Sequence, residues 1–233
     1  MSAVIEERVH PAGDEVVRGE SLRCVYHRGS EEVVAIDGVS VAVHSGELVA
    51  LVGPSGSGKT TLLNLIAGWE EPEAGQLRWR GGTEDHAALP WSELAIVPQG
   101  LGVLDELTVI ENVRLPLRVG PGSAKERQDV LGLLGLTEFV DRHPDELSLG
   151  QRQRVAIARA LILAPRLLLA DEPTGHQDAE WTPGVVEALH SACKQLGTAA
   201  LVATHDPEVL EHVDRTIELR DGRLVTSGVY EHP

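Results

Sequence analysis

The chain has 233 residues, 42% hydrophobic and 24% charged, which is the composition of a folded globular protein and excludes a largely disordered chain. Its 20 Lys and Arg residues against 36 Asp and Glu residues give a net charge of −16, which argues against a sequence-independent nucleic-acid binder and against electrostatic docking on anionic lipid. Aromatic residues make up only 3%, too few for a stacking platform that binds single-stranded nucleic acid.

The first third of the chain has the pattern of a β-rich segment followed by a glycine loop. Residues 1–18 are polar and show no hydrophobic period, so we expect a flexible extension there. Strands are predicted at Glu20–Tyr26 and Val33–Val43, and a short apolar strand at 46–52. The helix that follows the loop ends at Gly68, a residue typical of helix C-termini. A strand, a glycine loop and a helix in this order open a phosphate-binding α/β domain.

The middle of the chain changes from strands to helices and back. Strands are predicted at Gly75–Trp79 and Leu94–Val97. The pattern is helical from about 100 to 164, and Pro165 ends the last of these helices. The continuous apolar run at 166–173 is typical of a strand that is buried on both faces.

The last quarter completes an alternation of strands and helices. A helix is predicted at about 180–196, a strand at 198–205, and a short helix after Pro207. The segment TIELRDGRLVTSG predicts a hairpin with Asp221-Gly222 at its turn. We therefore predict an α/β fold with a mainly parallel sheet and a helical insertion, in one domain over residues 19–233.

The sequence GPSGSGKT matches the pattern G-x-x-x-x-G-K-[ST] and lies between a predicted strand and a predicted helix, as a phosphate-binding loop requires. Its glycines let the backbone approach a polyphosphate, which the loop N–H groups and the helix N-terminus bind. Lys59 would neutralise the β- and γ-phosphate oxygens, and the Thr60 hydroxyl would ligate Mg²⁺. The predicted nucleotide-binding residues of this segment are Gly53, Pro54, Ser55, Gly56, Ser57, Gly58, Lys59, Thr60 and Thr61.

The sequence RLLLADEP places two carboxylates at the end of a predicted strand. Asp171 would lie beside the glycine loop and hold Mg²⁺, directly or through water. Glu172 follows it, near the place of an attacking water, and would polarise that water as a general base. A surface acidic pair after a core strand is the alternative, and the neighbouring glycine loop argues against it.

Further motifs follow the glycine loop in order: Gln99 in VPQ, LSLGQRQR at 147–154, LLLADEPTG at 167–175, Asp178, and His205 in VATHD. With the glycine loop these motifs make six ordered elements, which resemble the nucleotide-binding subunit of ABC transporters over nearly the whole chain. The resemblance implies a P-loop NTPase fold of ABC type, with an antiparallel β subdomain and a helical subdomain at about 100–164 beside the core sheet. It also implies ATP hydrolysis, with ATP and Mg²⁺ as cofactors.

The resemblance also assigns roles to single residues. Gln99 would contact Mg²⁺ and the attacking water, and His205 would contact the γ-phosphate. Asp178 would link two subunits. Tyr26 lies about where the family places an aromatic residue that stacks on adenine, and a core position for this tyrosine is the alternative.

Ser148, Gly150 and Gln151 match the signature motif of the family at the start of a long helix. A helix N-terminus with a serine hydroxyl attracts an anion, and in the family this anion is the γ-phosphate bound to the other subunit. We therefore expect two chains, identical or paralogous, to enclose two ATP molecules. Leu149 replaces a glycine of the usual motif, and Gln177 stands where the family usually has leucine. Both departures bear on turnover and on coupling in the dimer.

The segment LTVIENVRLPL at 107–117 and the ADEPTG sequence resemble the lipoprotein-release and macrolide-export branch of bacterial ABC ATPases. The resemblance implies an integral-membrane permease as a partner, received in a groove formed by residues 99–117 and Pro144–Glu146. The alternatives are the ATPase of an ABC importer, a soluble ABC ATPase, and a regulatory module that binds ATP without hydrolysis.

The expected location is the cytoplasm. The sequence has no run of 18 or more apolar residues and no apolar core near its N-terminus, so we expect neither a membrane span nor a signal peptide. Cys24 and Cys193 lie far apart without the spacing of metal ligands, as expected of reduced thiols. We therefore expect no nucleic-acid partner and no direct membrane insertion, with attachment to the inner face of the cell membrane through the permease.

Overall fold

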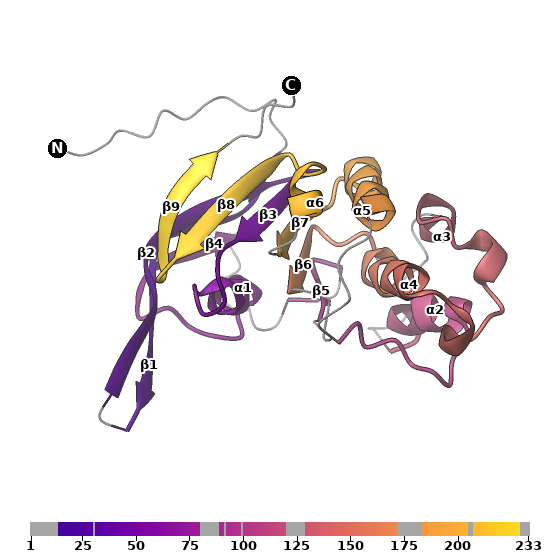
Figure 1. The fold of residues 1–233 in the computed structure, drawn as a ribbon, viewed down its shortest axis with the longest axis horizontal. Helices are drawn as coiled ribbons and strands as arrows, with labels where there is room; N and C mark the ends of the chain where they lie inside the picture. Colours follow the sequence, from indigo (N-terminus) through magenta and orange to yellow (C-terminus); the bar gives the residue numbers. More distant parts are fainter. Residues whose placement is uncertain are drawn as a thin grey trace.

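A six-stranded sheet lies at the centre of the molecule, in the order β5-β6-β7-β3-β8-β9 (Figure 1). Its neighbouring strands are parallel except β8 and β9, which form an antiparallel hairpin. The predictions of a mainly parallel sheet and of this hairpin are confirmed. The strands are β3 (Leu48–Val52), β5 (Leu94–Val97), β6 (Leu167–Asp171), β7 (Ala199–Ala203), β8 (Arg215–Arg220) and β9 (Arg223–Gly228). This computed structural model describes residues 14–29, 31–79, 89–90, 92–98, 100–119, 129–171, 183–204 and 207–228.

A second sheet of three antiparallel strands, in the order β2-β1-β4, forms the antiparallel β subdomain that the resemblance implied. It consists of β1 (Glu15–Arg28), β2 (Glu31–His44) and β4 (Ala74–Trp79). In Figure 1 the long β1 and β2 extend away from the helices at the other end of the molecule.

The prediction of a flexible extension over residues 1–18 is wrong for residues 15–18, which belong to β1. Val16 and Val17 are only 2% and 1% exposed, and Val17 pairs with Val43 on one side and Trp79 on the other. A register shift after Glu15 lets two consecutive valines reach the core, which breaks the period-2 alternation that strand prediction relies on.

The central sheet separates two hydrophobic cores, and β3 contributes to both. Leu48 and Ala50 belong to the core on the helical side, whereas Val49 and Leu51 face the core shared with the antiparallel sheet. This alternation follows from the period of two residues in a strand, and it explains why β3 has no polar residue. The helix α1 (Lys59–Ala67) packs in the second core, between the two sheets.

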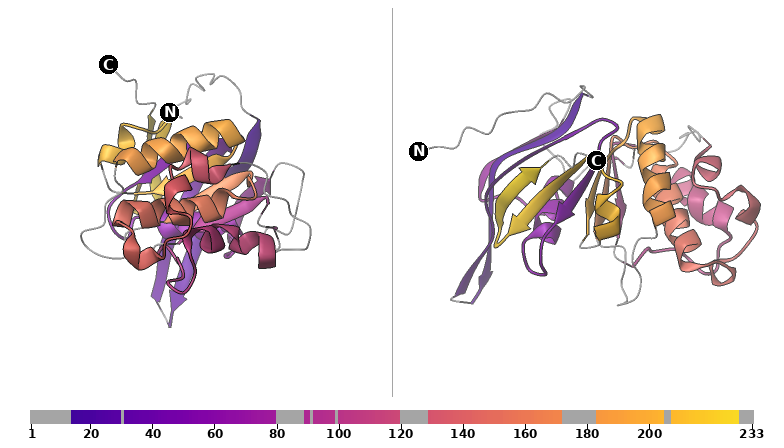
Figure 2. Two further views of the ribbon diagram at one scale, coloured as in Figure 1. Left: turned by 90° about the vertical axis from the view of Figure 1, so that its right-hand side faces the viewer. Right: turned by 45° about the horizontal axis from the view of Figure 1, so that its top comes forward.

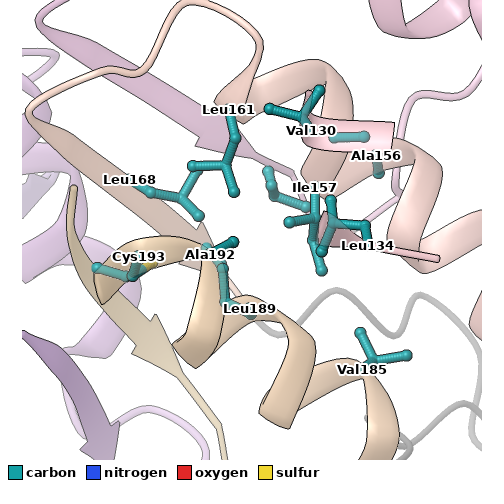
Figure 3. Close-up of a cluster of buried hydrophobic side chains, with 14 of the residues drawn as sticks. Val130, Leu134, Ala156, Ile157, Leu161, Leu168, Val185, Leu189, Ala192 and Cys193 are labelled. Atoms are coloured by element: carbon teal, nitrogen blue, oxygen red, sulfur yellow. The ribbon is translucent and has the colours of Figure 1, made fainter. Parts of the chain in front are cut away.

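The remaining helices cover the opposite face of the central sheet (Figure 2). Figure 3 shows this core, in which Ile157 and Leu161 of the long helix α4 lie near Leu168 of β6 and near Leu189 and Ala192 of α5. Among the described residues, no helix is long and apolar enough to cross a membrane. The elements are α2 (Val109–Val119), α3 (Val130–Leu133), η2 (Thr137–Phe139), η3 (Pro144–Glu146), α4 (Leu149–Leu161), α5 (Pro183–Leu196) and α6 (Pro207–Leu210).

Candidate nucleotide-binding site

The glycine loop between β3 and α1 depends on its glycines. Gly53, Gly56 and Gly58 have φ angles of 154°, 79° and 106°, which L side chains rarely adopt. A Cβ atom at Gly53 would lie 2.2 Å from the Leu219 carbonyl oxygen, and one at Gly58 would lie 2.5 Å from the Ala35 carbonyl oxygen. A Cβ atom at Gly56 would meet no atom within 4 Å, so this part of the loop faces open space. One side of the loop therefore packs against Leu219 and Ala35, and the side at Gly56 is open, as a phosphate-binding loop requires.

The side chain of Lys59 closes the loop from within. Its ammonium Nζ donates to the Gly53 carbonyl oxygen at 2.9 Å and to the Pro54 carbonyl oxygen at 3.3 Å, and the residue is only 7% exposed. Pro54, Ser55 and Gly56 form the exposed part of the loop above it. A cation held against the backbone of a loop at a helix N-terminus is suited to bind a polyphosphate.

Thr60 and Asp171 come together although 111 residues separate them in the sequence. The Thr60 hydroxyl, in the first turn of α1, donates to Asp171 Oδ2 at 2.9 Å, at the carboxyl end of β6. This distance fits two neighbouring ligands of Mg²⁺, because oxygens bound at about 2.0–2.1 Å in an octahedron lie about 2.9 Å apart. No group of three His, Cys, Asp or Glu side chains gathers to hold a metal in the described part of the chain. Thr60 and Asp171 are the two described side chains that would hold a magnesium ion at this place.

The turn of the β8–β9 hairpin supports the glycine loop from below. The Gly222 amide donates to the Ser57 carbonyl oxygen at 3.0 Å, and the Gly222 carbonyl oxygen accepts from the Asp37 amide at 2.8 Å. The sequence predicted the hairpin at Asp221-Gly222 but gave no sign of this contact with the loop. Only the pairing of β8 with β3 brings the turn to the loop.

Tyr26 lies on β1 beside the first turn of α1. Its hydroxyl donates to Glu70, and the Thr61 hydroxyl lies 3.3 Å from it, as the second partner in the same chain of hydrogen bonds. Burial and the hydrogen bond to Glu70 raise the pKa of Tyr26 to about 12, so the hydroxyl stays protonated. The residue is 37% exposed, which argues against the alternative of a core position.

The signature residues lie at the N-terminus of α4, on the helical side of the central sheet, whereas α1 packs on the other side (Figure 1). The Ser148 hydroxyl accepts from the Gln151 amide at 3.3 Å, and the Ser148 amide donates to Gln151 Oε1 at 2.9 Å, which forms a capping box. With Leu149, Gly150 and Arg154 these residues line an open hollow of about 490 Å³. The chain does not bring this hollow to its own glycine loop.

Four predicted site residues lie outside the described residues: Gln99, Glu172, Asp178 and His205. The strands that precede three of them, β5, β6 and β7, are parallel neighbours. Their carboxyl ends therefore meet at one edge of the sheet, where β3 leads into the glycine loop. Ligand sites in open α/β sheets lie at this edge.

Comparison with known proteins relates this chain to ATP-binding transport subunits. Residues 36–175 match the family model for ABC transporters. The chain is 39% identical to the lipoprotein-releasing system ATP-binding protein LolD of Paramagnetospirillum magneticum, over 88% of this chain and 96% of that protein. It is 42% identical to the protein of the same name from Gluconobacter oxydans, over 91% of this chain and 96% of that protein.

Solved structures of the same kind are similar to this fold. The dimeric structure of MJ0796, a bacterial ABC transporter cassette, has a TM-score of 0.76 at 30% identity, over 93% of this chain and 99% of that chain. A dimeric post-hydrolysis state of MJ0796 bound to ADP and Pi has a TM-score of 0.74 at 31% identity, over the same shares of both chains.

Proposed function

The chain belongs to the ABC transporter family as an ATP-binding, ATP-hydrolysing subunit, and from this we propose that it drives a lipoprotein-releasing membrane complex. The hydrogen bond between Thr60 and Asp171 carries the catalytic part of the proposal, because it joins the glycine loop to the carboxylate at the end of β6. Similarity to the LolD proteins supports the transport part. We further infer that the strands and helices from β1 onward form a single ATPase domain, with its helical part at about 100–164.

Hydrolysis in this proposal depends on charge and on water. The loop amides and the N-terminus of α1 bind the phosphates, and Lys59 neutralises part of their charge. The hydroxyl–carboxylate pair would hold Mg²⁺, which when bound draws charge from the β- and γ-phosphate oxygens. Glu172 accepts a proton from the attacking water, while Gln99 and His205 contact the water and the γ-phosphate.

Completion of each site requires a second chain. The loop and the signature hollow lie on opposite sides of the central sheet, so the capped helix end at Ser148 serves the ATP held by a partner chain. Asp178 links the two chains. The partner is a second copy or a paralogue, and loss of the bridging γ-phosphate lets the two chains separate.

The permease would dock on the surface between the end of β5 and α2. Leu104 is 41% exposed there, and the loop around it has a fixed shape. Asn112 of α2 is fully buried and holds the loop, because its amide donates to the Leu104, Leu107 and Thr108 carbonyl oxygens and its Oδ1 accepts from the Leu104 amide. A preformed apolar contact of this kind suits a helix of a membrane partner. Docking there would keep the chain at the inner face of the membrane without insertion.

The catalytic proposal is tested by Glu172→Gln in the full chain. Phosphate release from ATP with Mg²⁺ is expected to fall by at least about tenfold, because the general base is lost, while bound ATP is retained. Lys59→Ala is the matched control and is expected to lose ATP binding itself. Unchanged phosphate release in Glu172→Gln would remove Glu172 from the base role, and failure of the unsubstituted chain to retain ATP would overturn the ATPase proposal.

The transport proposal needs the membrane partner. A tagged chain is expected to co-purify from membranes with a multi-span protein, and the complex in proteoliposomes is expected to release a lipoprotein when ATP is added. A complex that instead moves a soluble solute inward would replace lipoprotein release with import.

A further inference from the structure

Glu70 lies three residues after the end of α1 and accepts hydrogen bonds from side chains of β1 and of α1. Glu70 Oε2 accepts from the hydroxyl of Tyr26 and from the thiol of Cys24 at 3.6 Å. Glu70 Oε1 accepts from the side-chain amide of Asn64 at 2.8 Å. Glu70 is half-buried, where a carboxylate is costly unless its oxygens are satisfied. The three donors satisfy both oxygens and fix the carboxylate in one place.

The end of α1 directs Glu70 toward β1. Gly68 has a φ of 71° and forms a left-handed cap, and the Trp69 and Glu70 amides both donate back to the Asn64 carbonyl oxygen, at 2.9 Å and 3.4 Å. The chain therefore turns back against β1 instead of continuing the helix. One helix thus carries the phosphate-binding residues in its first turn and positions Glu70 at its end.

The Tyr26 ring is held by its hydroxyl at both sides. The Thr61 hydroxyl, in the first turn of α1, lies 3.3 Å from the Tyr26 hydroxyl, and Glu70 accepts a hydrogen bond from that hydroxyl. Without these partners the ring would be free to change rotamer, because more than a third of the residue is exposed. The hydrogen bonds therefore fix the direction of a ring that still has exposed surface beside the phosphate-binding helix.

We propose that Glu70 is a positioning residue that holds the Tyr26 ring in the place where the adenine of a bound nucleotide stacks. This assignment rests on the proposed function, in which the chain binds ATP, and on the expectation from the family resemblance that Tyr26 stacks on the adenine. A ring that is already oriented needs no further ordering when the nucleotide binds, so affinity for the base increases. Because Glu70 and the phosphate-binding residues belong to the same helix and its cap, the phosphate and base contacts keep a fixed separation.

ADP and inorganic pyrophosphate are the probes, because both carry phosphates and only ADP carries the base. In the full chain, Glu70→Ala is expected to weaken ADP binding by about fivefold or more and to leave pyrophosphate affinity within about twofold, measured by calorimetry with Mg²⁺. Glu70→Gln keeps an oxygen that accepts from Tyr26, and most of the ADP affinity is expected to return. Glu71→Ala removes the exposed neighbouring carboxylate and is the control for the change in charge.

A double-mutant cycle separates a positioning role from a general structural one. Tyr26→Phe removes the hydroxyl, so Glu70→Ala in that background is expected to cause no further loss of ADP affinity, whereas additive losses would overturn the proposal. Equal losses for ADP and pyrophosphate in Glu70→Ala would overturn it as well, because Glu70 would then act on the helix.

The same measurements distinguish this inference from the proposed function. Weakened ADP binding in Tyr26→Ala with unchanged binding in Glu70→Ala would remove Glu70 from the positioning role and leave the ATPase proposal intact. A chain that binds neither ADP nor pyrophosphate would overturn both.

Discussion

Leu149 stands where the signature motif of the family usually has a glycine, at the first position of α4. Its side chain is half-buried and lines the hollow together with Ser148 and Gly150. In the proposed dimer the γ-phosphate held by the partner faces this helix end. A leucine there takes up space beside an anion and offers it no hydrogen bond, so it raises the free energy of the closed dimer.

Leu149→Gly is therefore expected to raise the steady-state ATPase rate of the full chain by roughly twofold or more. Glycine also weakens the first turn of the helix, so the free energy of unfolding should fall by up to about 1 kcal/mol. Leu133→Gly in α3 lies outside the hollow and is the control: it is expected to lose at least as much stability, because Leu133 packs against the hydrophobic core, and to show no gain in rate. An unchanged rate in Leu149→Gly would mean that the leucine is merely tolerated.

Single residues differ in how far the sequence could predict them. Lys59, Thr60 and Asp171 belong to motifs whose chemistry fixes both residue type and spacing. In the structure Lys59 contacts the backbone of the glycine loop, and Thr60 donates to Asp171. Glu70 has no such pattern, because its partner Tyr26 is 44 residues away and comes close only when β1 packs on α1. A long-range contact of this kind follows from the folded arrangement and not from a local pattern.

At the scale of elements, the β8–β9 hairpin acts on the glycine loop from outside the motif. The Gly222 amide in its turn donates to the Ser57 carbonyl oxygen, and the Arg223 guanidinium forms an ion pair with Asp37 of β2 at 2.6 Å. The hydrogen bond from Arg223 outweighs desolvation and lowers the pKa of the Asp37 carboxyl. The hairpin therefore contacts both the glycine loop, at Ser57, and β2, at Asp37, and holds the two together.

Gly222→Ala tests this support. Gly222 has a φ of 73°, and an added Cβ atom would lie 2.7 Å from the Ala35 carbonyl oxygen, so the turn must move. The free energy of unfolding is expected to fall by about 1–3 kcal/mol, and the KM for ATP to rise by about threefold or more. Gly29→Ala is the control: it has a φ of 64°, and an added Cβ atom there meets nothing within 4 Å. A lower melting temperature with unchanged KM would show that the hairpin stabilises the fold but not the loop.

The start of β1 could not be predicted from the sequence pattern. The strand was expected to begin at Glu20 and begins at Glu15, because a register shift places Val16 and Val17 both inward. By contrast, the sequence predicted β3 and β6, because strands that are covered on both faces need apolar residues at nearly every position.

For the whole molecule, net charge opposes association. At −16 per chain, two copies repel each other, and the chain without nucleotide is expected to be monomeric at low salt. Glu172→Gln with ATP and Mg²⁺ is expected to form a dimer, and higher salt to strengthen it by screening the repulsion. Light scattering with and without nucleotide measures both effects, and a stable dimer without nucleotide at low salt would contradict the expectation.

The placement of the glycine loop and the capped end of α4 on opposite sides of one sheet has a consequence for ATP dependence. In a two-fold homodimer, any movement that brings one loop to its partner's helix end also brings the second pair together. Filling the first site thus favours closure around the second, so occupancy should rise cooperatively with ATP concentration. Pairing with a paralogue would relax this symmetry and allow one site to lose hydrolysis while the other drives the cycle.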